Sequence, residues 1–151
     1  DYVRINKLGF DLTSVTVNDW NLFESERKVD SLVFTNNLIK GSSSSSFSLI
    51  EAGMDYNDTK NWYIAKNYSD ADAGIFLYSK NNNLVFENNN FKNYTSPIKI
   101  FFHNNLKIRD NSIGKLNLIR GNNAEIIRNQ FINPEEIIHE AIEIYNYPED
   151  T

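Results

Sequence analysis

The sequence contains an internal repeat built around asparagine. Five stretches align so that an asparagine always falls at the same place: LVFTNNLI, WYIAKNYS, LVFENNNF, LKIRDNSI and AEIIRNQF. The aligned residues are Asn37, Asn67, Asn89, Asn111 and Asn129, separated by 30, 22, 22 and 18 residues. A fixed period near 22 residues is typical of stacked structural repeats, and the longer first interval predicts an insertion in that period.

Apolar residues keep fixed places around each asparagine. Three positions earlier stand Phe34, Ile64, Phe86, Ile108 and Ile126. Two positions later stand Ile39, Phe91, Ile113 and Phe131, with Ser69 as the exception. In a stack of strands, an inward asparagine at a bend can hydrogen-bond its counterparts in the coils above and below, about 4.8 Å away. Because such a ladder satisfies amides that would otherwise be buried unpaired, the pattern predicts an all-β solenoid of about five to six coils.

This pattern resembles the right-handed parallel β-helix of the pectin-lyase-like superfamily, whose coils carry an inward asparagine between the second and third strands. The resemblance covers about residues 30–146, and weakly residues 15–23, where Asn21 takes the ladder position if one extra residue is allowed. It implies one β-helix domain over residues 1–151, with residues 1–30 as a poorly matched edge coil. A coil buries its open face only against a neighbour, so we expect a fragment or domain of a longer protein.

Composition narrows the class of protein. A length of 151 residues with 40% apolar residues suits one domain with its own core. A net charge of −5 argues against nucleic-acid binding, and no apolar run approaches the length of a membrane span. The absence of cysteine excludes disulfides and fits a reducing cytosol or a bacterial secreted protein. The resemblance favours the second, so we expect a secreted or cell-surface bacterial protein, although no signal peptide is visible.

Each copy of the repeat is followed by a loop and then by an alternating strand. These strands read FSLIE, IFLYS, IKIFF, LNLIR and AIEIY. The alternation predicts inward pairs at Phe47/Leu49, Ile75/Leu77, Ile98/Ile100, Leu116/Leu118 and Ile142/Ile144. It also predicts a first outward column of Ser48, Phe76, Lys99, Asn117 and Glu143. The serine run 42–46 is expected to be a loop at a coil corner, and Glu51–Asn61 a long loop that overhangs the stack.

A second outward column is apolar, and we call it the apolar stripe: Ile50, Tyr78, Phe101, Ile119 and Tyr145. Apolar stripes of this size seldom stay uncovered. We expect this one to stack sugar rings, to receive an overhanging loop, or to contact a second domain or partner chain.

Basic residues lie beyond the stripe. Lyases that resemble this fold cleave uronic-acid polymers by β-elimination, in which a cation neutralises the substrate carboxylate and a Lys, Arg or His removes the C5 proton. The resemblance places Lys99, His103 and Arg120 as candidate catalytic residues, with Lys99 or His103 as the base. The candidate substrate-binding residues are Lys80, Tyr78, Phe101, Asn117 and Glu143.

Several signatures of related enzymes are missing. The sequence has no paired aspartates with a Gly-His-Gly partner, as in polygalacturonases, and only two histidines, His103 and His139. The pairs Asp55/Asp58 and Asp70/Asp72 fall in expected loops, where acidic residues are common turn formers. We therefore predict no cofactor, and the sequence does not support a calcium site. We therefore expect a polysaccharide-interacting module, either part of an uronate lyase or a non-catalytic glycan-binding or assembly module of the adhesin or tailspike kind.

The segment 134–145 fits two structures. Asn133, Pro134 and the two following glutamates form a helix start, yet AIEIY alternates like the other strands. We favour a short helical loop followed by a strand over one continuous capping helix.

Overall fold

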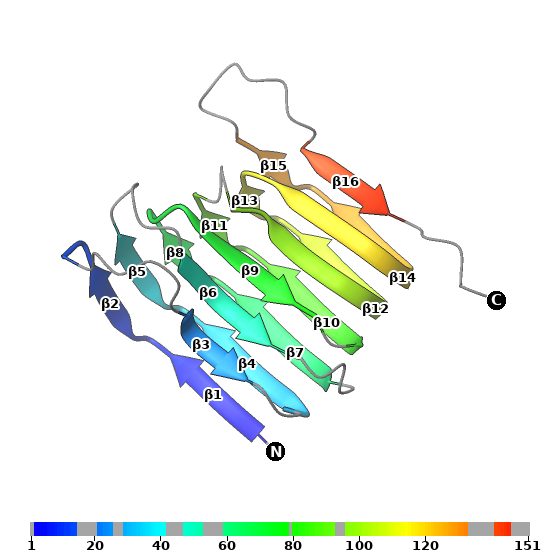
Figure 1. Cartoon of the computed structure of the whole chain (residues 1–151), viewed down its shortest axis with the longest axis horizontal. Helices are drawn as coiled ribbons and strands as arrows, with labels where there is room; N and C mark the ends of the chain where they lie inside the picture. The colour runs from blue at the N-terminus through cyan, green and yellow to red at the C-terminus, as the bar shows by residue number, and fades with distance from the viewer. Residues whose placement is uncertain are drawn as a thin grey trace.

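The protein is all-β in the part that the structure describes. The computed structural model describes residues 2–14, 21–25, 29–41, 47–52, 59–78, 80–92, 96–132 and 141–145. The strands follow one another along the stack from β1 to β16 (Figure 1). In chain order they are β1 (Tyr2–Asn6), β2 (Gly9–Leu12), β3 (Asn21–Ser25), β4 (Ser31–Thr35), β5 (Leu38–Gly41), β6 (Phe47–Ala52), β7 (Thr59–Ala65), β8 (Tyr68–Ser69), β9 (Ala73–Leu77), β10 (Asn81–Glu87), β11 (Asn90–Phe91), β12 (Ile98–Arg109), β13 (Ser112–Ile113), β14 (Leu116–Ile127), β15 (Gln130–Phe131) and β16 (Ile142–Tyr145).

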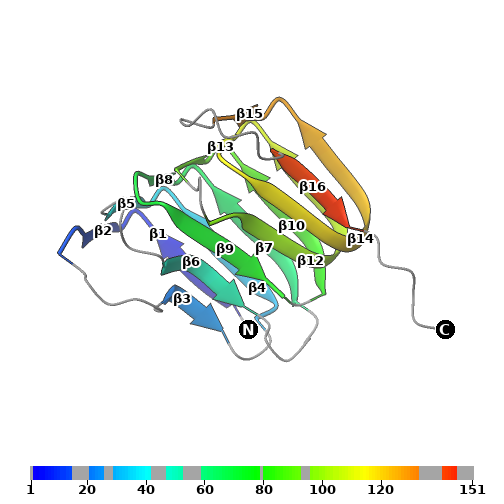
Figure 2. The same cartoon turned by 45° about the horizontal axis from the view of Figure 1, so that its top comes forward.

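All described strand pairs are parallel, and they form two sheets. The small sheet has the order β15-β13-β11-β8-β5-β2. The large sheet has ten strands and is strongly curled (Figure 2). One arm of it contains β1, β4, β7 and β10, and the other contains β3, β6 and β9. The long strands β12 and β14 run through both arms, and β16 pairs with β14.

The curl of the large sheet has a local cause. Phe102 in β12 and Arg120 in β14 have φ angles of 48° and 50°, so each strand turns sharply at the same level. A second bend follows at Asn105 and Asn123, which also have positive φ. Asparagine tolerates this backbone region better than most residues. These bends carry the chain around the core without breaking the pairing of the two strands on either side.

The predicted asparagine ladder is present. The backbone N–H and the side-chain Nδ2 of each ladder residue both donate to Oδ1 of the next, at 2.9–3.1 Å from Asn37 through Asn111 to Asn129. Each Nδ2 also donates to a backbone carbonyl of the preceding coil, such as that of Phe34 for Asn67. Asn37, Asn67, Asn89 and Asn111 are buried. Their polar atoms therefore have partners although water is excluded.

The ladder position of the first coil was predicted wrongly. Asn21 lies in β3 and pairs with Ser48 of β6, so it is not a ladder residue. The equivalent position belongs to Leu8, whose backbone N–H donates to Oδ1 of Asn37 at 3.1 Å. The stretch from β1 to β2 aligns with β4 and β5 in register, but its repeat lacks the asparagine that made the other copies visible.

The predicted inward positions form the core of the middle coils. Leu49, Ile75, Leu77, Ile98, Ile100, Leu116 and Leu118 are all buried. The prediction that Ile50 faces outward is wrong, because Ile50 is fully buried and pairs with Ile75. The register shifts between Ser48 and Ile50, which marks a bulge, so Leu49 and Ile50 both pack inward and Glu51 pairs with Phe76. The side chain of Phe47 lies outside the described residues.

The last strand confirms part of the prediction for residues 134–145. Ile142–Tyr145 is a strand, so a continuous capping helix is wrong there, while the expected helical loop at 134–140 lies outside the described residues. Ile142 and Ile144 continue the inward columns of Leu116 and Leu118. They are nevertheless 36% and 67% exposed, because no further coil of the described structure packs on them.

The architecture is therefore all-β, with parallel sheets, one of them strongly curled. This arrangement is consistent with a parallel β-solenoid. Among the described residues, no helix is long and apolar enough to cross a membrane. The serine run and most of the Glu51–Asn61 insertion lie outside the described residues.

The ladder gives the first testable prediction. Asn89→Ala and Asn111→Ala should each lower the free energy of unfolding by about 1–3 kcal/mol, because neighbouring amides lose buried partners. Asn90→Ala is the matched control, since Asn90 is exposed on the adjacent strand and should change stability by less than about 0.5 kcal/mol. Equal denaturant midpoints for the ladder variants and the control would contradict a structural role of the ladder.

Candidate functional site

The outward columns of the curled sheet gather most of the predicted site residues. Phe76, Lys99, Asn117 and Glu143 are in register on β9, β12, β14 and β16, as the alternation predicts. Ser48 does not join them, because the bulge puts Glu51 opposite Phe76. The next column pairs Phe101 with Ile119 and Ile119 with Tyr145. With Tyr78, which follows β9, these residues make up the apolar stripe without Ile50.

Four aromatic rings on this face contact one another, and we call them the aromatic platform: Phe76, Tyr78, Phe101 and Phe102. The rings of Phe76 and Tyr78 are nearly parallel, with centroids 6.1 Å apart and planes 9° apart. Tyr78 lies 5.0 Å from Phe101, and Phe101 lies 6.4 Å from Phe102. All four are only half-buried. The platform is a partly exposed, rigid apolar surface, because its members belong to or directly follow paired strands.

Phe102 was missed because it breaks the alternation. Its positive φ turns the strand, so two consecutive phenylalanines reach the same cluster of rings. The only signal in the sequence is the doubled aromatic in IKIFF. A strict period of two assigns the second phenylalanine to the interior.

Two of the predicted catalytic residues hold cations above this platform. The Nζ atom of Lys99 lies 5.7 Å from the centroid of the Phe76 ring. The guanidinium of Arg120 lies 5.9 Å from the centroid of the Phe102 ring. Both distances are within the range in which a cation is attracted to the face of an aromatic ring. The platform therefore combines apolar stacking area with positive charge at two places.

His103 occupies a different position from that expected. It is 6% exposed, pairs with Gly121, and its Nδ1 has no hydrogen-bond partner. Its ring fills the space over Gly121, where a side chain of any other residue would collide with it. Burial lowers the pKa of His103, so the imidazole is neutral near pH 7.

The remaining predicted residues surround the platform unevenly. Glu143 accepts a hydrogen bond from Tyr145 and forms a salt bridge of 2.9 Å with Lys115. Asn117, predicted to face outward, is buried at 7% exposed, and its Oδ1 has no hydrogen-bond partner. Lys80 is exposed where the chain enters β10.

The three candidate catalytic residues do not all lie together. Lys99 and His103 are four residues apart on one strand, a separation of about 13 Å in an extended strand, and the bend at Phe102 lies between them. Arg120 precedes the partner of His103, so these two share the bend.

Acidic residues of the other arm are engaged in ion pairs. Glu87 accepts hydrogen bonds from the Tyr63 hydroxyl at 2.6 Å and from Nε of Arg109 at 2.5 Å. The hydrogen bond from Tyr63, more than the one from Arg109, lowers the pKa of Glu87 despite some desolvation. A carboxylate held in its charged form does not suit general acid catalysis. We interpret this cluster as structural.

Metal binding finds no support in the described ranges. They contain no group of three or more His, Cys, Asp or Glu side chains that is able to hold a metal ion. The Oδ1 atom of Asp70 accepts the backbone N–H of Gly41 in the neighbouring coil at 3.0 Å, so this carboxylate links two coils. Asp55, Asp58 and His139 lie outside the described residues.

No protein-family model, curated protein or solved structure matches the chain. Its function must therefore be inferred from the chemistry of its own surface.

The burial of His103 predicts a pH dependence of stability. Its folded pKa is lower than the ordinary value of 6.5, so the unfolded chain binds a proton at higher pH than the folded protein does. The free energy of unfolding should have its full value above about pH 7 and should fall as the pH drops below the pKa of His103 in the unfolded chain. The variant His103→Gln should lack this loss, which denaturant titrations from about pH 7 to about pH 5 would measure.

The second histidine supplies the control for this experiment. His139→Gln removes the other histidine of the sequence, and we expect this variant to keep the pH-dependent loss of stability seen in the unmodified protein. Parallel profiles for His103→Gln and the unmodified protein would contradict the assignment of the titration to His103.

Proposed function

We propose that this protein is a polysaccharide-binding module built as a right-handed parallel β-helix of the pectin-lyase-like kind. The parallel register of successive coils and the inward asparagine ladder support the β-helix. In this arrangement the aromatic platform lies along the outer face of consecutive coils, where a linear polymer has room to run along the stack. Its expected place outside a bacterial cell belongs to the same proposal.

The observation that carries the binding function is the platform with its two cations. Flat aromatic rings offer apolar area at low conformational cost, and the apolar face of a sugar ring stacks on such a surface. Phe76, Tyr78 and Phe101 supply this area on adjacent strands. Lys99 and Arg120 add positive charge over the outer rings, which suits the carboxylates of uronic-acid residues. The favoured ligand is therefore an anionic polysaccharide.

The geometry favours binding over β-elimination. A catalytic base must reach the proton that it removes, at about 2.6–3.2 Å. His103 is in the neutral form that a base requires, and it shares its bend with Arg120, which is the observation in favour of a lyase. Its ring is however buried over Gly121, and the bend separates it from Lys99. A non-catalytic module needs no convergence of these three side chains.

A binding experiment tests the platform. Alginate and polygalacturonate oligosaccharides should bind saturably to the unmodified protein, measured by calorimetric titration or on immobilised protein. Phe101→Ala and Lys99→Ala should each raise Kd about tenfold or more, because one removes stacking area and the other a cation. Tyr2→Ala is the matched control, since Tyr2 is an exposed aromatic in the first coil, away from the platform.

The same samples separate binding from catalysis. β-Elimination creates an unsaturated product with a new ultraviolet absorbance, and we expect none from alginate, pectate or chondroitin sulfate. Product formation that Lys99→Ala or Arg120→Ala abolishes would establish the lyase instead. Absence of binding to every anionic glycan tested would overturn the proposed function.

A further inference from the structure

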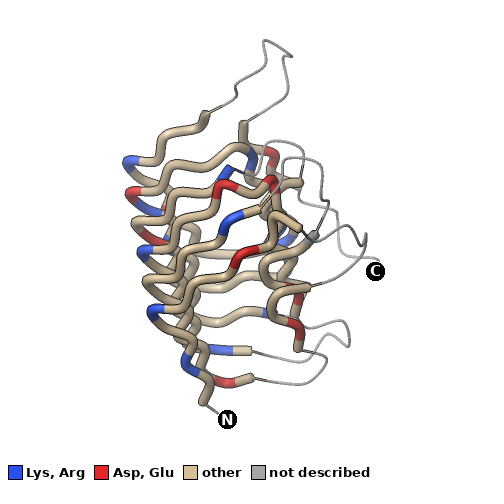
Figure 3. Tube along the Cα trace, turned by 90° about the vertical axis from the view of Figure 1, so that its left-hand side faces the viewer, with Lys and Arg blue, Asp and Glu red and all other residues tan. Residues whose placement is uncertain are grey.

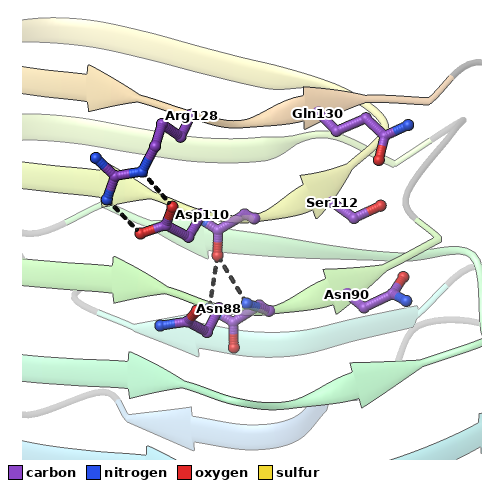
Figure 4. Close-up of a pocket in the computed structure, with 8 residues that line it drawn as sticks. Asn88, Asn90, Asp110, Ser112, Arg128 and Gln130 are labelled. Atoms are coloured by element: carbon purple, nitrogen blue, oxygen red, sulfur yellow. Dashed lines mark hydrogen bonds and ion pairs between the residues drawn. The ribbon is translucent and has the colours of Figure 1, made fainter.

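A shallow depression lies on the outside of the small sheet, away from the aromatic platform. It is lined by Asn88, Asn89, Asn90, Asp110, Asn111, Ser112, Arg128 and Gln130. Figure 4 shows its walls as two columns of side chains that run along the stack. One column contains Asn88, Asp110 and Arg128, and the other contains Asn90, Ser112 and Gln130. The floor between them includes the ladder residues Asn89 and Asn111.

The backbone places these two walls rigidly. Asn88, Asp110 and Arg128 have φ angles of 54°, 56° and 50° and directly precede ladder residues, so each side chain leaves its turn in the same way. Asn90, Ser112 and Gln130 are in-register partners on β11, β13 and β15. Each wall therefore repeats at the spacing of parallel strands, about 4.8 Å. Its polar groups are positioned in advance of any ligand, which lowers the entropic cost of binding.

The two walls differ in whether their hydrogen bonds are already made. Arg128 donates to both carboxylate oxygens of Asp110, at 2.6 and 2.8 Å, so the charges of the first wall neutralise each other. The side chains of the second wall make no hydrogen bond within the described structure. Asparagines elsewhere on the surface behave differently: Asn83 donates to Asn61, and Asn105 donates to Asn83, at 3.2 Å. The second wall thus keeps free amide and hydroxyl groups.

An aromatic side chain extends the second wall by one coil. Tyr68 is the in-register neighbour of Asn90 and is 40% exposed. The column therefore reads as one exposed ring followed by three neutral hydrogen-bonding groups. Rings and neutral hydrogen-bonding groups are the combination that recognises sugar rings without carboxylates. Figure 3 shows basic and acidic residues close to one another along the upper part of one edge of the stack, so that part of the surface does not carry a single sign of charge.

We propose that this depression is a second glycan-binding site, which takes a neutral oligosaccharide lying along the stack. The ring of Tyr68 stacks on one sugar ring. The hydroxyl groups of the following sugar rings form hydrogen bonds with Asn90, Ser112 and Gln130. The Arg128–Asp110 pair forms the opposite wall and offers no net charge to a polyanion. The inference shares only the ligand class with the proposed function, because no residue of the aromatic platform takes part.

Titration of the intact protein with neutral sugars tests the second site. The probes are cello-, xylo-, manno- and galacto-oligosaccharides, each measured by calorimetry. We expect at least one of them to bind, and Tyr68→Ala and the double variant Asn90→Ala/Gln130→Ala each to raise its Kd about tenfold. The substituted residues Tyr68, Asn90 and Gln130 are exposed, and the control residue Phe76 is half-buried. Thermal melts of each variant check that the fold is kept.

Phe76→Ala distinguishes the two sites. It should leave neutral-sugar binding unchanged, just as Tyr68→Ala should leave the binding of anionic oligosaccharides unchanged. Lack of binding of every neutral probe would overturn this inference and leave the platform untouched. Equal loss of neutral-sugar binding in Phe76→Ala would also overturn it, because one site would then serve both classes of sugar.

Discussion

The hydrogen bonds of the asparagine ladder are the interaction on which the rest of the structure depends. Each ladder residue sends its backbone N–H and its side-chain amide to the same oxygen of the next coil, as Asn67 does toward Asn89. Coil spacing and register are thereby fixed at the turn between the curled sheet and the small sheet. The order of surface columns follows from that register, because side chains alternate along each strand. Both candidate sites are made of such columns.

The sequence predicted best what the ladder controls. Around Asn37, Asn67, Asn89 and Asn111 the flanking apolar residues, such as Phe86 and Phe91, are buried as expected, whereas Ile126 and Phe131 beside Asn129 are only partly buried. Where it is replaced by Leu8, the repeat was invisible and Asn21 was taken for its missing member. Hydrophobic spacing alone does not reveal a coil whose turn is stabilised by a backbone N–H rather than by an amide side chain.

The surface was harder to predict because local backbone changes reset the alternation. The bulge after Ser48 moved Ile50 into the core, and the positive φ of Phe102 added a ring to the platform. His103 was placed on the surface by counting, yet it packs over Gly121 at the bend. Neither a bulge nor a left-handed residue leaves a clear mark in one sequence. The register of a column is predictable only between such points, as for Lys99, Asn117 and Glu143.

Native-state hydrogen exchange at individual asparagine amides tests the central role of the ladder most directly. The backbone N–H groups of Asn37, Asn67, Asn89 and Asn111 each donate to the next ladder residue, whereas that of Asn129 has no acceptor in the described structure. We expect the first four to exchange only on global unfolding and Asn129 to exchange much faster. Fast exchange at Asn67 and Asn89, similar to that of Asn129, would contradict a ladder that holds the coils together.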